Sequence, residues 1–386
     1  SIEEAYQRAL QYLRNLGKEA LIFIDNYNNI DDCLMDIERL SCHVIISSRS
    51  NNPDMFLGMK LGFLSLKNCK KIFRRFYTVE YNDIMNEIIH LSGYLTIAVE
   101  LLAKTAEIQA ISLLELYEIL RDKEFDIHTV IRSNWDNTSE CLEEELTRHF
   151  EIIFDITPIN QNPQKVNLLQ NFSLLPYLGI NQKEIMKWLG LNRETNLLFD
   201  LYNAGWLEKS ENQEYSMHPL ISYTVRKYNS PTLKDCFQLV SSMSEQIHIT
   251  EGDNYVELFF YLPYADSVGK YFRNRNTESD LILGRLFCEL ATIYAANGEY
   301  GNAYSWGEAA GFQMESINDC KEKTVLLNVL FNAMAEICLD MRNRNEECKE
   351  WAEKAVQHDE KHPDTISKLQ ISNSFHNLGC AYIQLR

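Results

Sequence analysis

The sequence predicts a mainly helical chain of several domains, with a partial α/β region at its start and an array of helical repeats at its end. Three observations carry this prediction: two short apolar runs at 21–24 and 44–46, three helical segments followed by two short strands between 165 and 219, and small residues that recur every 44 residues in the last hundred. The 386 residues are 45% hydrophobic and 24% charged, a composition typical of globular domains with several cores.

Charge and cysteine content narrow the function classes. Because 55 acidic residues outnumber 37 basic ones, a nonspecific binder of nucleic-acid backbone is not expected. The ten cysteines form neither a C-x-x-C pair nor a cluster with histidine at metal-ligand spacing, so we expect reduced thiols. No apolar run approaches the roughly 20 residues that cross a bilayer, and no signal peptide is recognisable. These features predict a cytoplasmic protein without a membrane partner.

The two apolar runs predict neighbouring strands of a parallel sheet. After a helical segment at 4–16, residues 21–24 form a run without alternation, which is typical of a strand buried on both faces, and this run ends in Asp25. The second run, 44–46, is followed by two serines and Arg49. A carboxylate at the carboxyl end of such a strand can hold a Mg²⁺ water beside phosphates, so Asp25 is a candidate catalytic and Mg²⁺-binding residue, with Arg49 near the terminal phosphate. The alternative is a strand followed by a capping aspartate without a ligand.

A compact domain of three helices and a hairpin is predicted over 139–229. Asn181 is the expected N-cap of the second helix, and Gly205 ends the third. Residues 206–221 then predict two short strands around the polar turn Ser210–Gln213, the wing of a winged-helix fold. Since the third helix carries no lysine or arginine, we do not expect it to read DNA bases.

The last domain, 230–386, is predicted to be a tetratricopeptide-like α-solenoid. Ala291, Ala335 and Gly379 recur at a spacing of 44 residues, longer than the roughly 34 of the commonest repeat of this type. Small residues let paired helices approach closely, and stacking buries faces that one repeat cannot bury alone. The last repeat has one helix, so we expect the array to continue or a partner to cap it. A protein or peptide ligand is expected on the repeats.

These segments resemble, in their order, the NB-ARC ATPases of the STAND class. "LIFIDN" resembles the Walker B strand of that family and "HVIISSRS" its sensor strand. "FLSLKNCKKIFRRF" and "LSGYLTIAVELLAK" resemble the first helices of its small helical domain, and "YSMHPLI" its Met-His-Asp motif in a Met-His-Pro form. The resemblance implies the C-terminal part of an α/β P-loop NTPase core over 1–61, a small helical domain over 62–138, the winged helix and the repeats.

The resemblance also implies site residues and cofactors. It places Arg49, Gly93, Leu95, Thr96 and His218 around ADP or ATP with Mg²⁺. Met217, His218 and Pro219 would form the switch motif, in which the histidine reaches the ADP phosphate and latches the winged helix onto the core. A histidine that only closes a wing strand is the alternative.

Two departures from the family pattern limit this expectation. No G-x-x-x-x-G-K-[ST] phosphate loop occurs in the chain, so we expect that loop on sequence preceding Ser1 and no tight nucleotide binding by this chain alone. Asn26 stands where the family often has a second acidic residue, so the intact parent is expected to be at most a slow ATPase.

The leading hypothesis is a regulatory switch that is latched by ADP, senses a partner through the repeats and self-associates after nucleotide exchange. One alternative is an interaction scaffold with a degenerate nucleotide core. Another is a transcription regulator whose DNA-binding domain lies outside this chain.

Overall fold

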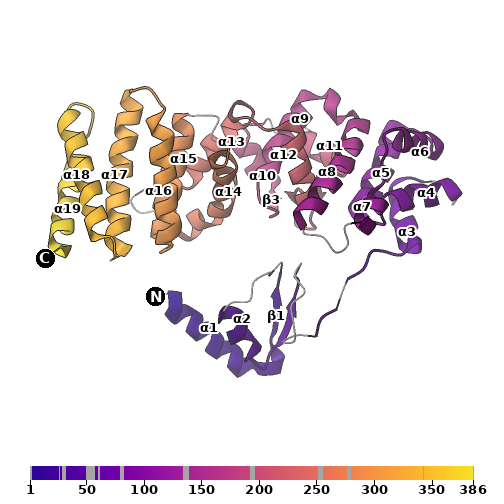
Figure 1. Cartoon of the computed structure of the whole chain (residues 1–386), viewed down its shortest axis with the longest axis horizontal. Coiled ribbons are helices and arrows are strands. Elements are labelled where there is room, and N and C mark those ends of the chain that lie inside the picture. Colours follow the sequence, from indigo (N-terminus) through magenta and orange to yellow (C-terminus); the bar gives the residue numbers. More distant parts are fainter. Residues whose placement is uncertain are drawn as a thin grey trace. The chain divides into compact units, whose positions relative to one another are not determined.

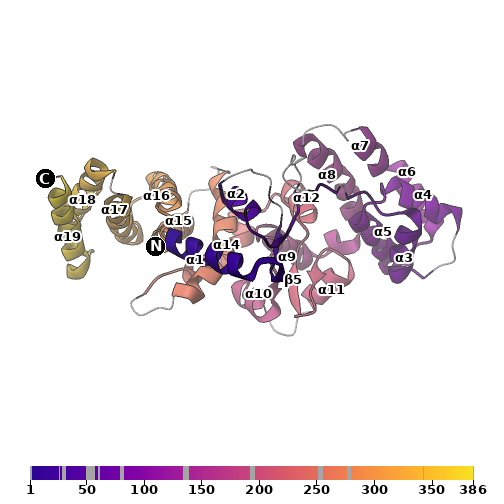
Figure 2. The same cartoon turned by 90° about the horizontal axis from the view of Figure 1, so that it is seen from below.

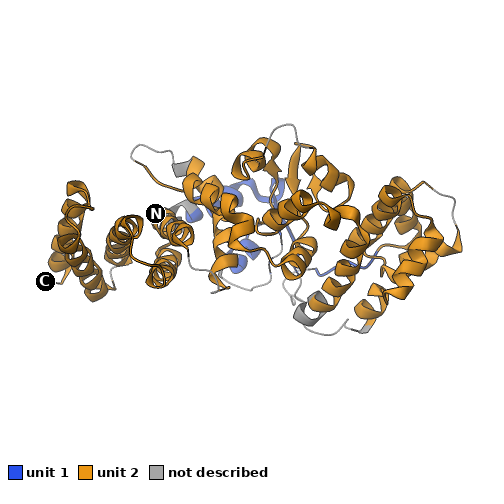
Figure 3. Cartoon of the chain, turned by 90° about the horizontal axis from the view of Figure 1, so that it is seen from above, with its two compact units in different colours: residues 1–63 blue, residues 64–386 orange. Residues whose placement is uncertain are grey.

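The chain is mainly helical, which confirms the coarse prediction of a helical, multi-part protein (Figures 1 and 2). The computed structural model describes all residues except 1, 26, 28–31, 49–56, 60, 79–81, 134–138, 192–195, 251–254, 276–279, 342 and 386. Two compact units, Ser1–Phe63 and Leu64–Arg386, divide the chain, and Figure 3 shows them in different colours. The division falls close to the predicted boundary at residues 61 and 62, and the three later segments share the second unit.

The first unit contains a two-stranded parallel sheet. Its elements are α1 (Ile2–Leu16), the 3₁₀ helix η1 (Gly17–Glu19), β1 (Leu21–Ile24), α2 (Asp32–Glu38) and β2 (His43–Ile46). β1 pairs with β2 in parallel, starting with Leu21 opposite His43. The expected burial on both faces is wrong for the described residues, because Leu21, Phe23 and Ile45 are 64%, 63% and 52% exposed. Parallel sheets are normally covered on both faces, whereas in each of these strands exposed residues alternate with partly exposed ones.

The second unit begins with five helices, in which α3 packs against α5, and α4 packs against α3, α6 and α7. They are α3 (Leu66–Phe76), α4 (Asp83–Leu91), α5 (Thr96–Gln109), α6 (Leu113–Asp122) and α7 (Ile127–Ser133). Three of these helices begin where a polar side chain, from Ser65, Asn82 or Ser112, accepts a hydrogen bond from the backbone N–H three residues on. α5 follows Leu95, which has no side-chain acceptor, so its first N–H groups lack such a cap.

The next segment has the helices and the hairpin that the sequence predicts. Its elements are α8 (Ser139–Ile156), η2 (Pro158–Gln161), α9 (Pro163–Ser173), β3 (Ile180–Asn181), α10 (Gln182–Trp188), α11 (Leu197–Asn203), β4 (Glu208–Lys209), β5 (Glu214–Ser216) and α12 (Pro219–Asn229). The strands predicted around Ser210–Gln213 are confirmed as the antiparallel pair β4 and β5, and β3 extends the sheet in the order β3-β5-β4. Asn181 caps α10 as predicted. α9 ends at Ser173, shortly before Pro176, since a proline disfavours helical geometry at the residue that precedes it.

The chain continues as antiparallel helices that pack in sequence order. They are α13 (Leu233–Gln246), α14 (Tyr255–Arg273), α15 (Leu281–Ala296), α16 (Tyr300–Glu315), α17 (Lys321–Met341), α18 (Asn345–Lys361) and α19 (Lys368–Gln384). Figure 1 shows α15 to α19 side by side, which confirms the predicted helix pairs. Ala291 and Ala335 are buried, but the packing role expected for Gly379 is wrong, because no described heavy atom lies within 4 Å of a Cβ built there. Gly307 on α16 provides a close approach instead, against Met334 of α17.

α17 is the one helix in the described part of the chain that is long and apolar enough to cross a membrane. The expectation that no segment approaches this length is therefore wrong. One such helix is weak support for a membrane span, since core helices pass the same test. Its apolar residues Leu330, Met334 and Ile337 are buried, and its buried Asn328 and Asn332 donate hydrogen bonds to side chains of α18 and α19, so α17 packs within the repeats.

Buried His149 on α8 links stability to pH. Its Nδ1 accepts a hydrogen bond from the Asp126 N–H at 3.3 Å, and its ring lies edge-on to Phe125. Burial lowers the pKa of His149 below its ordinary value of 6.5, and Arg148 lowers it further, against the opposite effect of Asp126 and Glu145. Since the folded-state pKa is depressed, the unfolded chain binds more protons near pH 6, and stability present above pH 6.5 is lost as pH falls through the folded-state pKa.

We therefore expect the temperature of the thermal unfolding midpoint to decrease when the pH is lowered from about 7.5 to about 5.5. His149→Gln keeps a neutral acceptor for the same N–H and should lose part of this dependence; burial also lowers the pKa of His128 and His218, so the rest remains. Circular dichroism melts at both pH values test this, with exposed His376→Gln as control. Equal pH dependence in His149→Gln and wild type would contradict it.

Candidate functional site

A pocket of about 410 Å³ lies in the second unit where α5 meets the hairpin segment. We call it the α5–α12 pocket, because its walls are the first turns of α5, the turn between α11 and β4, and the start of α12. Leu95, Thr96 and His218, three of the residues that the family resemblance names, line this pocket together.

The start of α5 supplies backbone donors to the pocket. The turn between α4 and α5 has Gly93 and Tyr94 at φ of 62° and 58°. A Cβ at Gly93 would lie 2.8 Å from the Ile131 side chain, so this glycine shapes the turn behind the pocket rather than lining it. Leu95 then leaves the N–H groups of the first turn without a side-chain cap, and the exposed Thr96 adds a hydroxyl. The start of a helix in this state attracts an anion.

His218 supplies a side-chain donor from the opposite wall. It is the N-cap of α12, where its Nδ1 accepts a hydrogen bond from the Leu220 N–H at 3.2 Å. This bond assigns the neutral tautomer, in which Nε2 carries the proton and has no partner among the described residues. Burial lowers the pKa of His218, against the opposite effect of Glu208, so the neutral form is favoured. Met217, which is buried, precedes this histidine, and Pro219 follows it at the first position of α12, where its fixed φ suits the start of a helix.

Charged side chains complete the pocket. Lys104 is 7% exposed, and its Nζ lies 2.7 Å from Glu100 and donates to the Tyr202 carbonyl at 3.3 Å. Glu208 accepts a hydrogen bond from the Tyr177 hydroxyl at 2.5 Å. Lys209 lies over the Tyr215 ring at 5.3 Å. The lining contains two lysines and two glutamates, so these side-chain charges balance. The groups left to attract an anionic group of a ligand are the start of α5 and His218.

Asp25 belongs to the first unit. It is exposed at the carboxyl end of β1 and accepts a hydrogen bond from Ser47, which follows β2. Parallel pairing brings these two strand ends together, as expected. One carboxylate and one hydroxyl fit a Mg²⁺ contact made through water, and no group of three histidine, cysteine or acidic residues suited to a metal occurs in the described residues. Arg49 lies outside the described residues.

Local sequence did not point to all of the residues that form the pocket. Lys104 and Tyr202 join it through a contact between residues 98 positions apart, and Glu100 is the i,i+4 ion-pair partner of Lys104. One usable signal exists: Lys104 is a charged residue within the apolar stretch of α5 that the structure buries. A buried lysine needs a partner, which predicts a nearby carboxylate or carbonyl.

No protein-family model and no curated protein matches this chain. Among solved structures, the chain is similar to the crystal structure of a signal transduction ATPase with numerous domains (STAND) with a tetratricopeptide repeat sensor from Pyrococcus horikoshii. The two share 13% identity and a TM-score of 0.37, over 98% of this chain and 67% of that chain. At this TM-score the similarity does not establish the fold or the function of this chain.

Proposed function

We propose that this chain is the switch and sensor part of a STAND-class regulatory ATPase, in which the α5–α12 pocket holds the phosphate end of ADP. The observation that carries the proposal is the convergence of the uncapped start of α5, Thr96 and the unpartnered Nε2–H of His218 on one pocket. Residues 139–229 would act as a winged helix and 230–386 as the tetratricopeptide-like sensor for a protein or peptide.

The residues present define how such a switch works. A phosphate group in the pocket would accept hydrogen bonds from α5 on one side and from His218 on the other. Because α5 and α12 come from different parts of the second unit, this bridge ties the helical segment to the winged-helix segment. A triphosphate that fits the pocket less well would weaken this bridge, so the nucleotide state is linked to how freely the two segments move. Exchange of ADP for ATP would then free the surfaces used for self-association.

The charge balance of the pocket suits the resting state. Glu100 and Glu208 oppose the accumulation of further negative charge, so the pocket accommodates the end of a diphosphate better than an additional phosphate. Asp25 is the described residue that would hold a water of a Mg²⁺ ion that accompanies the nucleotide. Hydrolysis would be slow, because Asp25 is followed by Asn26 rather than by a second carboxylate.

His218→Ala tests this proposal directly. The protein is purified together with any coding sequence that precedes Ser1, and its ADP affinity is measured by titration calorimetry. One lost hydrogen bond to a charged group should weaken ADP binding by at least about tenfold. The matched control is His376→Ala, an exposed histidine of α19 that does not line the pocket. Unchanged ADP affinity in His218→Ala, or no ADP binding by the wild type, would overturn the proposal.

A second candidate function is a non-enzymatic interaction scaffold. The observation in its favour is the lack of a phosphate-loop motif in the 386 residues. Under this alternative, the pocket only joins the segments, and the repeats bind their partner with equal affinity with and without ADP. The calorimetry above separates the two functions, because a scaffold binds no ADP.

A further inference from the structure

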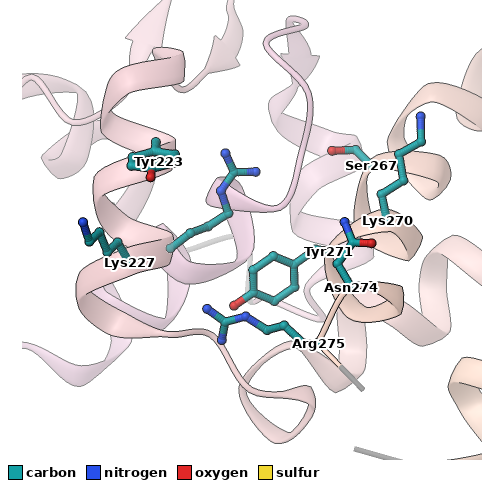
Figure 4. Close-up of a pocket in the computed structure, with 8 residues that line it drawn as sticks. Tyr223, Lys227, Ser267, Lys270, Tyr271, Asn274 and Arg275 are labelled. Carbon is teal, nitrogen blue, oxygen red and sulfur yellow. The ribbon is translucent and has the colours of Figure 1, made fainter. Parts of the chain in front are cut away.

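A second pocket, of about 570 Å³, lies between α12 and the C-terminal end of α14. Among the residues that the structure describes, four cationic side chains and no acidic one line it: Arg226 and Lys227 from α12, and Lys270 and Arg275 from α14 and the turn after it. In a chain of net charge −18, this concentration of positive charge is local. We call it the basic pocket. Figure 4 shows Tyr223 and Lys227 on one side, and Tyr271 and Arg275 reaching toward them from the other.

The four cations differ in whether a described carboxylate pairs with them. Lys270 lies 2.7 Å from Asp266, and Lys227 lies 3.9 Å from Glu144. By contrast, neither Arg226 nor Arg275 forms an ion pair with any carboxylate in the part of the chain that the structure describes. Two guanidinium groups therefore share the pocket without neutralisation, an arrangement that an incoming anion would stabilise.

Neighbouring tyrosines contact or influence both arginines, and both arginines keep their charge. Arg275 stacks over the Tyr271 ring at 4.7 Å, and the Tyr271 hydroxyl donates to the Pro231 carbonyl at 2.9 Å. Burial lowers the pKa of Arg226, and the charge of Arg275 also lowers it, while Tyr271 and Tyr223 act in the opposite direction. Both guanidinium groups stay protonated in proteins, so the repulsion between them persists at neutral pH.

We propose that the basic pocket binds a small molecule with a phosphate group, held by Arg226 and Arg275. A planar guanidinium offers paired N–H donors that match phosphate oxygens, and two such groups suit a dianion. The volume lies in the range of about 300 to 1,000 Å³ that is usual for small-molecule sites. It exceeds the need of free phosphate, so the ligand carries a further group, for which Tyr223 and Asn274 provide a hydroxyl and an amide.

The position of the pocket gives the ligand a regulatory role. α12 begins at the α5–α12 pocket with His218 as its N-cap and carries Arg226 two turns later in the basic pocket. A bound phosphate would clamp α12 to α14, where the winged-helix segment meets the helical repeats. This inference does not require that the first pocket binds ADP.

The test is titration calorimetry of the whole chain with inorganic pyrophosphate at about 0.15 M ionic strength. We expect saturable binding in the wild type and about tenfold weaker binding in Arg226→Gln and in Arg275→Gln. Arg275 is exposed, so its variant should fold even if Arg226→Gln does not. The matched control is Arg148→Gln on α8, which removes an exposed arginine outside the pocket and should leave the affinity unchanged. Weaker binding in the two arginine variants, with Arg148→Gln unchanged, would assign the pyrophosphate site to the basic pocket rather than to the proposed nucleotide site.

Three results would overturn the inference. The first is a wild-type dissociation constant for pyrophosphate above about 1 mM, and the second is wild-type affinity for pyrophosphate in Arg275→Gln. The third is equal affinity of the wild type for citrate and for pyrophosphate, which would show that any polyanion suffices. Binding of a phosphoserine peptide with no binding of pyrophosphate would also overturn it, since a macromolecular ligand would then replace the small molecule.

Discussion

Replacing Asn328 with leucine should lower the free energy of unfolding of the repeat segment by about 3 kcal/mol. Asn328 lies on α17, is 1% exposed and donates to the Asp359 carboxylate of α18 at 2.6 Å. Asp359 is itself 2% exposed, and its second carboxylate oxygen has no partner in the described part of the chain. The substitution therefore removes the one side-chain donor that the structure shows for a buried carboxylate. Leaving that carboxylate buried without its donor costs more free energy than the hydrogen bond contributes to stability.

The same asparagine holds a network across three helices. Ser374 of α19 accepts hydrogen bonds from the amides of Asn328 and Asn332. Asn377 in turn donates to Asn332 at 3.0 Å. Because these groups are buried, a partly satisfied network is more costly than an apolar contact of the same shape. The effect of Asn328→Leu should therefore extend to α19.

A double substitution separates this explanation from simple misfit. Adding Asp359→Leu removes the stranded carboxylate, so the double variant should recover most of the stability lost in Asn328→Leu. Hydrogen exchange of the α17 and α19 amides measures this locally, which suits a chain whose parts need not unfold together. Asn373→Leu, an exposed position on α19, controls for the added leucine. If Asn328→Leu and the double variant are equally unstable, the buried carboxylate is not the cause.

Features that depend on neighbours along the chain could be predicted from the sequence. Asn181 caps its helix, the hairpin turns at Ser210–Gln213, and the apolar run 21–24 forms a parallel strand. Each follows from local backbone chemistry or from a short apolar pattern. The exposure of this strand and the open space around Gly379 could not be predicted, because both depend on which distant segments pack against these residues.

The candidate site divides in the same way. The family resemblance names Leu95, Thr96 and His218, and these residues line one pocket. Lys104 joins them only through the fold, since its partner carbonyl at Tyr202 is 98 residues away. The basic pocket shows no sequence signal either, because Arg226 and Arg275 come from separate helical segments and neither belongs to a dense cationic run.

Gly205→Val should also destabilise the second unit by about 3 kcal/mol, and under the proposed function it should weaken ADP binding at the α5–α12 pocket as well. Gly205 ends the turn after α11 at φ of 83°, in the left-handed region where a β-branched residue is strained. A Cβ there would lie 3.0 Å from Leu101 and 3.0 Å from the Lys104 side chain on α5. Both neighbours are buried, so they have little room to give way.

The effect on ligand binding follows from the same contact. Displacing Lys104 would break its hydrogen bond to the Tyr202 carbonyl and move the wall that α5 forms in the α5–α12 pocket. Thermal unfolding and ADP calorimetry should therefore change together. Gly311→Ala on α16 is the matched control, since a Cβ there meets only Leu330 at an ordinary 3.7 Å and should raise helix stability by about 0.5 to 1 kcal/mol. A Gly205→Val protein with the wild-type unfolding midpoint would show that this turn can move away from α5, and the pocket would then not be a rigid junction.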